Sequence, residues 1–245
     1  MAGLLTSGCR GDEFESSVRE KLLTYTFRFG PVLEAYPQLL AGAWLTIQLS
    51  ASAMLLGLAV AIICAWIKTS GPKPIRFLVD VYVEIIRNTP FLVQIFFIFF
   101  GLPALGLRLS PNAAALLAMV VNVGAYATEI IRAGIESIHK GQVEAGLALG
   151  LKPLQVFRYI ILKPALRTVY PALASQFILL MLTSSVVSAI SADDLTSKAN
   201  LIQSLTFTTF EVYLVVTLIY LVLAMAFSGL FSTIYRLAFS YPDRR

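Results

Sequence analysis

The sequence has few charged residues, a single histidine and two cysteines. Charged residues make up 13% of the 245 residues, about half of the roughly 25% that is usual for a soluble domain. With 58% hydrophobic residues, the composition excludes a disordered chain, which needs a polar excess. The histidine and cysteine counts exclude a His/Cys zinc site and a disulfide scaffold. No Gly-x-x-x-x-Gly-Lys-Ser/Thr segment is present, which excludes a P-loop for a nucleotide.

Long apolar runs without any charge are the strongest pattern that is present. Each run supplies the roughly 20 apolar residues that cross a hydrocarbon core of about 30 Å. The runs cover residues 35–67, 88–107, 109–128, 168–192 and 212–235. We predict an all-α, polytopic membrane protein with five transmembrane helices, at about residues 39–67, 79–103, 110–132, 168–192 and 211–236.

The basic residues fall unevenly on the two sides of these spans. Of the 19 Lys and Arg residues, thirteen lie on one side, which also holds the loop at residues 132–167. Cytoplasmic loops carry such an excess, so we expect the N-terminus outside and the C-terminus inside. The predicted organisation is an outer tail at 1–37, a membrane domain at 38–238 and a cytoplasmic tail at 239–245. Apolar spacing within 13–29 predicts a surface helix against the membrane.

Acidic and basic residues near the span ends have helical spacing. Glu84 and Arg87 are expected to form an ion pair near the inner surface, and Glu129 and Arg132 repeat this spacing on the third span. Asp193 and Asp194 are expected to start a short outer helix and to cap it.

The longest polar loop, about residues 139–167, has the pattern of two short helices. Gly141 is placed to cap the first helix, with Glu144 three residues later, where it can pair with first-turn amides. Gly150 suits the left-handed position that ends a helix. A helix of about two turns is marginal alone, so its apolar residues must be buried against something. A second helix should begin at Lys152-Pro153 and run to Pro164.

This loop carries a recognisable motif. The residues Glu144-Ala145-Gly146, Gly150 and Ile160-Ile161-Leu162 before a proline resemble the EAA loop of ATP-binding-cassette (ABC) importer permeases. Gly146 stands where alanine is commoner in that family. The resemblance implies that the short helix is a coupling helix, which docks in a groove of a separate ATPase and follows its closure. The implied ATPase-coupling residues are Glu144, Ala145, Gly146, Leu147 and Gly150.

A second segment narrows the family. Arg87-Asn88-Thr89-Pro90-Phe91-Leu92-Val93-Gln94 resembles the Arg-x-Thr-Pro-x-Leu-Val-Gln stretch of the polar amino acid permeases (the histidine, glutamate, glutamine, arginine and opine group), which have a type I importer fold. The resemblance implies a homo- or heterodimer with a second permease, two cytoplasmic ATPase subunits that hold ATP and Mg, and an extracytoplasmic binding protein. The chain itself would hold no cofactor. The expected function is ATP-driven import of a polar amino acid across the bacterial inner membrane by alternating access, not an enzymatic reaction.

Polar residues inside the apolar spans are the candidates for the substrate path: Thr89, Pro90, Gln94, Ser184 and Ser185. Each has a structural alternative. A helix broken at Pro90 can expose backbone groups to a substrate, or the proline is a tolerated kink. Gln94 and the serines must face protein or a water-filled cavity rather than lipid, where they would bind substrate or join helices.

Two other functions share parts of these patterns. A permease for another small solute would have the same EAA loop. A gradient-driven secondary transporter would normally show ionisable residues at mid-membrane and an internal repeat, and neither is evident. The lack of an acid between residues 168 and 192 favours a neutral or acidic amino acid as substrate.

Overall fold

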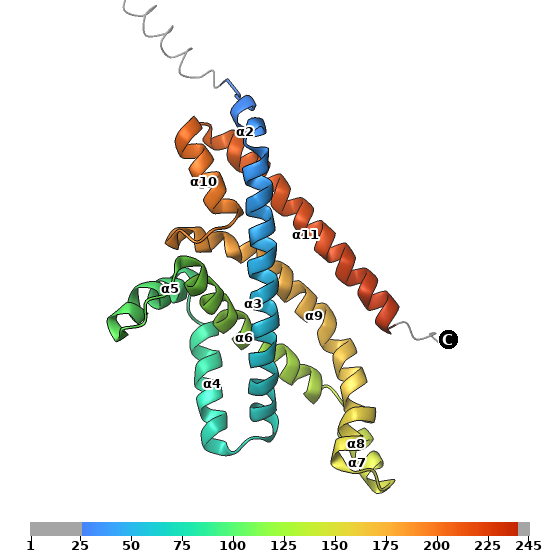
Figure 1. Ribbon diagram of the computed structural model, residues 1–245. Helices are drawn as coiled ribbons and strands as arrows, with labels where there is room; N and C mark the ends of the chain where they lie inside the picture. The colour runs from blue at the N-terminus through green and yellow to red at the C-terminus, as the bar shows by residue number, and fades with distance from the viewer. Residues whose placement is uncertain (1–25, 240–245) are drawn as a thin grey trace, which may run out of the picture.

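The computed structural model describes residues 26–239, and these residues form helices without any strand (Figure 1). Four helices are long and apolar enough to cross a membrane, and a bent pair could supply a fifth crossing. The four are α3 (Tyr36–Ser70), α6 (Pro111–Glu136), the helix Pro153–Ile190 and α11 (Thr209–Phe239). The predicted polytopic all-α architecture is therefore confirmed.

The second predicted span is broken rather than continuous. Helix α4 (Lys73–Arg87) and the segment Phe91–Leu105 meet at an angle of 111°. That segment consists of α5 (Phe91–Phe96), a π-helical turn η1 (Phe97–Gly101) and a 3-10 turn η2 (Leu102–Leu105). Pro90 disfavours helical geometry at the residue before it, and α4 ends there. The prediction of one helix over 79–103 is wrong, and Figure 1 shows α5 turning away from the axis of α4.

Small residues let the first and third spans pack closely. The buried face of α3 is made mostly of them: Gly42, Ala43, Thr46, Ser50, Ala53, Gly57, Ala61 and Ala65. Small residues allow helix backbones to approach where lipid supplies no hydrophobic driving force. A Cβ at Gly57 would lie 2.2 Å from Cγ1 of Val123 on α6. The two helices are therefore so close here that a side chain at position 57 would clash.

An ion network joins the C-terminal parts of α3 and α6 to the middle of α4. The ammonium of Lys68 lies 2.7 Å from Asp80 Oδ1 and 2.6 Å from Glu129 Oε1. Arg132 pairs with Glu129 at 2.8 Å, which confirms the predicted pair on the third span. Three helices are thereby fixed to one another by this network.

The predicted ion pair between Glu84 and Arg87 is wrong. Glu84 instead accepts a hydrogen bond of 2.9 Å from the Asn88 amide. The Arg87 guanidinium lies over the ring of Tyr126, 5.6 Å from its centroid.

The fourth span is continuous with the loop helix before it. Helix α8 (Pro153–Val156) runs through a π-helical turn η3 (Phe157–Ile161) into α9 (Leu162–Thr183) and a 3-10 turn η4 (Ser184–Ile190). The helix was expected to end at Pro164, but the wider π turn precedes that proline and accommodates its missing N–H. Helices α8 and α9 are therefore parts of one continuous helix.

The remaining helices lie at the two ends of the molecule. Helices α2 (Gly30–Glu34) and α10 (Leu195–Thr206) lie at one end, and α7 (Lys140–Ala148) lies at the other (Figure 1). As predicted, Asp194 caps α10, since its carboxylate accepts a 2.7 Å bond from the Ser197 N–H. Most of the surface helix predicted at 13–29 lies outside the described residues.

Candidate functional site

The first helix of the EAA-like loop is α7, and it begins two residues earlier than predicted. Its N-cap is His139, whose Nδ1 accepts a 3.1 Å hydrogen bond from the Gly141 N–H. Gly141 has no side chain that could accept a bond from the first turn. The prediction of Gly141 as the cap is therefore wrong.

The end of α7 is as predicted. Gly150 has a φ of +82°, in the left-handed region that glycine adopts without steric cost. The Leu151 N–H donates to the Gly146 carbonyl at 3.1 Å, and the Gly150 N–H donates to the Leu147 carbonyl at 2.9 Å. These two bonds define a Schellman motif, which separates α7 sharply from α8.

Gly146 allows α7 to lie directly on the helix that follows it. It is buried, and a Cβ at this position would lie 2.3 Å from Ile160 Cδ1 and 3.3 Å from Val156 Cγ2. Both neighbours belong to the continuous helix of α8, η3 and α9. The side chains of Ile160 and Val156 therefore pack directly on the backbone of α7 at Gly146.

The opposite face of α7 is open. Glu144 and Ala145 are exposed, as are Leu147 at 48% and Leu149 at 83%. The Glu144 side chain makes no hydrogen bond or ion pair with any residue in 26–239, so it does not pair with the first-turn amides as expected. An exposed acid beside leucines at one end of the molecule is a surface suited to a protein partner. We call Glu144, Ala145, Leu147 and Leu149 the docking face.

Gln94 joins the broken second segment to α6. Its amide nitrogen donates to the Ile86 carbonyl at 2.7 Å and the Thr89 carbonyl at 3.0 Å. Its oxygen accepts a 3.0 Å bond from the Asn122 amide. These carbonyls lie at the break before Pro90, where regular helical bonds end. The geometry supports the helix-joining alternative for Gln94, and its role in the substrate path stays a prediction.

The other predicted path residues also make local backbone bonds. The Thr89 hydroxyl donates to the Ile85 carbonyl at 2.8 Å. Ser184 is fully buried and donates to the Met181 carbonyl at 2.7 Å, and Ser185 donates to the Leu182 carbonyl at 2.9 Å. Pro90 is exposed at the break. Substrate contact by these four residues remains untested.

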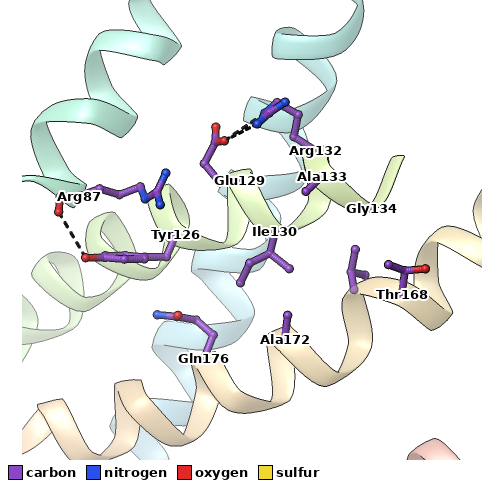
Figure 2. A pocket seen from close by; sticks show the side chains of 11 residues that line it. Arg87, Tyr126, Glu129, Ile130, Arg132, Ala133, Gly134, Thr168, Ala172 and Gln176 are labelled. Atoms are coloured by element: carbon purple, nitrogen blue, oxygen red, sulfur yellow. Dashed lines mark hydrogen bonds and ion pairs between the residues drawn. The ribbon is translucent and has the colours of Figure 1, made fainter. Parts of the chain in front are cut away.

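A cavity of about 550 Å³ lies between the end of α4, the C-terminal part of α6 and the first two thirds of α9 (Figure 2). Its polar lining comes from Arg87, Tyr126, Glu129, Arg132, Thr168 and Gln176. None of the five predicted substrate-path residues lines it. Sequence reasoning missed Tyr126 and Gln176, because no local pattern indicates that residues 50 positions apart meet across a cavity.

Arg87 is the unexpected member of this cavity. Helix α4 rises about 1.5 Å per residue, so Arg87 lies about 21 Å along the axis from Lys73. Asp80, seven residues before Arg87, pairs with Lys68 at the end of α3, so Arg87 lies about 10 Å further along α4 than that end. This position is inside a hydrocarbon core of about 30 Å, whereas the sequence placed Arg87 near the inner surface. Arg87 is exposed to the cavity and makes no ion pair with any described residue. A charged residue at such depth normally marks a substrate or ion pathway.

The other charges in the cavity are already paired. Glu129 is held by Lys68 and Arg132, while the Tyr126 hydroxyl donates to the Arg87 carbonyl at 3.5 Å (Figure 2). Arg87 therefore gives the cavity a positive charge and has planar donors for a carboxylate. Among residues 26–239, no three His, Cys, Asp or Glu side chains are grouped to hold a metal ion.

A buried acid connects the helices at the opposite end. Asp194 is fully buried, and Tyr220 of α11 donates to its Oδ2 at 3.4 Å. Burial raises the pKa of Asp194 to about 6. The neighbouring Asp193 is exposed, and its hydrogen bond to Lys198 lowers its pKa.

Known proteins match the chain over most of its length. The glutamine transport system permease protein of Escherichia coli strain K12 is 35% identical over 204 residues, covering 82% of this chain and 93% of that protein. The L-cystine transport system permease protein of Bacillus subtilis strain 168 is 41% identical over 164 residues, covering 67% of this chain and 70% of that protein.

Solved structures agree with the architecture. The crystal structure of an amino acid ABC transporter with histidines matches with a TM-score of 0.82 and 36% identity, covering 86% of this chain and 99% of that chain. The MetNI methionine ABC transporter in an inward-facing conformation matches with a TM-score of 0.72 at 20% identity, covering 84% of this chain and 99% of that chain. The second match supports the fold alone.

The family assignment follows from a match over most of the membrane domain. Residues 57–238 match the model of the binding-protein-dependent transport system inner membrane components. This confirms the predicted ABC importer permease, a transport component that works with a separate ATPase and a solute-binding protein and is not itself an enzyme. The chain belongs to the family of binding-protein-dependent transport system inner membrane components.

Proposed function

We propose that this protein is the permease subunit of an ATP-driven importer for a polar amino acid. The observation that carries the proposal is Arg87, which lines a cavity of about 550 Å³ inside the membrane domain and makes no ion pair with any residue in 26–239. A guanidinium binds a carboxylate through two parallel hydrogen bonds, and every amino acid has an α-carboxylate. The relatives that transport glutamine and L-cystine support this substrate class.

The substrate would be neutral or acidic. Glu129, the acid that lines the cavity, is already paired with Lys68 and Arg132. A cationic side chain would have to compete for it against two basic groups. The Gln176 amide makes no hydrogen bond with any described residue, so it can contact a polar side chain of the substrate.

The mechanism would be alternating access driven from the docking face. A cytoplasmic ATPase, which holds ATP and Mg, would bind the docking face and move α7 as it closes. Because Gly146 packs on Ile160 and the helix continues through η3 into α9, α9 would follow. Thr168 and Gln176 on α9 form one wall of the cavity. The opposite wall on α4 and α6 is tied by the Lys68 network, so the two walls can separate.

The assembly would contain a second permease, two ATPase subunits and an extracytoplasmic binding protein. Its place would be the bacterial inner membrane, with α7 and the C-terminus in the cytoplasm. The excess of basic residues on the side of α7 supports this orientation. The membrane domain would extend over 38–238, between an outer tail and a short cytoplasmic tail. The predicted roles of Thr89, Pro90, Gln94, Ser184 and Ser185 in the path belong to the same proposal.

Uptake by the reconstituted complex tests the function. Proteoliposomes would hold the chain with its ATPase and binding protein, and labelled glutamine, glutamate, cystine, histidine and arginine would be supplied one at a time. We expect ATP-dependent uptake of a neutral or acidic amino acid, with at least a tenfold loss in Arg87→Gln. Arg108→Gln changes an exposed arginine outside the cavity and is the matched control. Uptake that needs an ion gradient but no ATPase would show a secondary transporter instead.

A further inference from the structure

A groove of about 340 Å³ lies between α9 and α11, on the side of the cavity away from α6. Figure 1 shows α11 running beside α9 along one edge of the molecule. Small and hydroxyl-bearing residues line the groove, including Ser175 on α9 and Ser232 on α11. Tyr170 and Tyr235 line the end nearer α7, with ring centroids 5.8 Å apart. The Tyr170 hydroxyl donates to the Phe231 carbonyl at 3.1 Å and joins the two helices there.

The length of the groove matches one leaflet of a bilayer. Its lining on α9 extends from Tyr170 to Ile178, about 12 Å along a helix. One leaflet contributes about 15 Å to the hydrocarbon core. Tyrosine rings concentrate at the headgroup level of membrane proteins. The groove therefore runs from the headgroup level through most of the acyl-chain region of the leaflet on the α7 side.

Two arginines lie one helical turn beyond the tyrosine end. Arg167 precedes the lining residue Pro171 by four positions, and Arg236 follows the lining residue Ser232 by four. Residues four apart share a helix face. Both arginines are exposed, and neither makes an ion pair with any residue between 26 and 239. The lining contains no acid, so the mouth of the groove is positively charged.

We propose that this groove binds one anionic phospholipid. The phosphate would lie between Arg167 and Arg236, and one acyl chain would lie along the groove. Basic pockets between transmembrane helices on the cytoplasmic side are typical sites for anionic headgroups. Ser232 lies one turn deeper than Arg236, and its exposed hydroxyl makes no hydrogen bond with any described residue. It is placed to donate to an ester oxygen of the lipid.

Native mass spectrometry of the purified full chain tests the proposal. The chain in detergent would be given phosphatidylglycerol, phosphatidylcholine or inorganic phosphate. We expect one retained phosphatidylglycerol per chain, at least fivefold weaker retention of phosphatidylcholine, and no retained phosphate. The double variant Arg167→Gln/Arg236→Gln should lower phosphatidylglycerol retention at least tenfold. Ser232→Phe should do the same with both arginines present, because the ring fills the groove. Arg108→Gln removes one positive charge outside the groove; it is the control and should retain lipid like the wild type.

Three results would overturn the proposal. Equal retention of phosphatidylglycerol and phosphatidylcholine would show an unspecific annular contact. If the double variant Arg167→Gln/Arg236→Gln still retains phosphatidylglycerol, the two arginines do not bind the lipid headgroup. A change of oligomeric mass in Ser232→Phe without loss of lipid would identify the groove as an interface between copies of the chain. If Ser232→Phe does not fold, the double variant decides, since its two changes lie on exposed side chains. None of these measurements requires the ATPase, so their result does not depend on the result of the transport assay.

Discussion

Replacing Gln94 with leucine should destabilise the membrane domain by about 2 kcal/mol. The Gln94 amide bonds to the carbonyls of Ile86 and Thr89 and to the side chain of Asn122. Leucine has a similar size, so the substitution removes these bonds with little change in packing volume. Hydrogen bonds inside membrane proteins are worth about 0.6 kcal/mol on average and about 1.7 kcal/mol at most. These three bonds, together with the 2.9 Å bond from the Gln94 amide nitrogen to the Thr89 hydroxyl, give about 2 kcal/mol.

Equilibrium unfolding in mixed micelles of increasing SDS content, followed by circular dichroism, measures this change. Asn122→Leu removes one of the four bonds and should cost about 0.6 kcal/mol. The double variant should cost less than the sum of the single variants, because both delete the bond between the two side chains. Thr233→Val is the control, since its hydroxyl bonds only to Gly229 of its own helix. A Gln94→Leu protein that unfolds at the wild-type SDS content would refute the role assigned to this network.

Three further predictions follow from α7 and Asp194. Gly150→Ala should cost about 1–2 kcal/mol, because a φ of +82° suits glycine, and thermal melts would show the loss. Gly146→Ala should keep ATPase coupling, because the closest contact of the new Cβ is the flexible end of Ile160 and Val156 Cγ2 at 3.3 Å has to shift only a few tenths of an ångström, whereas Gly146→Phe should abolish coupling in the same assay. The stability of the wild type should fall as pH rises from about 4 to about 6. The pKa of the buried Asp194 is about 6, against 3.8 in the unfolded chain. In this pH range the folded state therefore keeps a proton that the unfolded state releases. Asp194→Asn should remove this pH dependence of SDS unfolding, and an unchanged dependence would assign it to another group.

Most of the helices could be predicted from the sequence because charge is excluded from lipid. The charge-free runs at 35–67 and 109–128 correspond to α3 and α6 within a few residues at most ends. The end of α7 was also predictable, since Gly150 and the residues before it define a local motif. In these cases the residues within one segment are enough to predict where the helix lies and where it ends.

The features that depend on distant contacts could not be predicted in the same way. A proline in a membrane helix gives a kink or a break depending on what accepts the freed groups. Here the break before Pro90 is supported by Gln94 and Asn122. Because charged residues were taken to mark the ends of spans, Arg87 was expected near the surface. In the structure, Arg87 is the last residue of α4 and lies inside the membrane domain. The cavity also needs Gln176, which reaches it only through the crossing of α6 and α9.

The central claim is that an ATPase drives this permease through the docking face. The most direct test is the ATPase activity of the complete complex in lipid nanodiscs with an amino acid-loaded binding protein, comparing the wild type with Glu144→Arg. Glu34→Arg reverses the same charge on an exposed residue of α2 at the opposite end and serves as the control. Like charges facing each other across an interface cost several kcal/mol, so stimulation in Glu144→Arg should fall at least tenfold while Glu34→Arg keeps it. Full stimulation in Glu144→Arg would contradict the account.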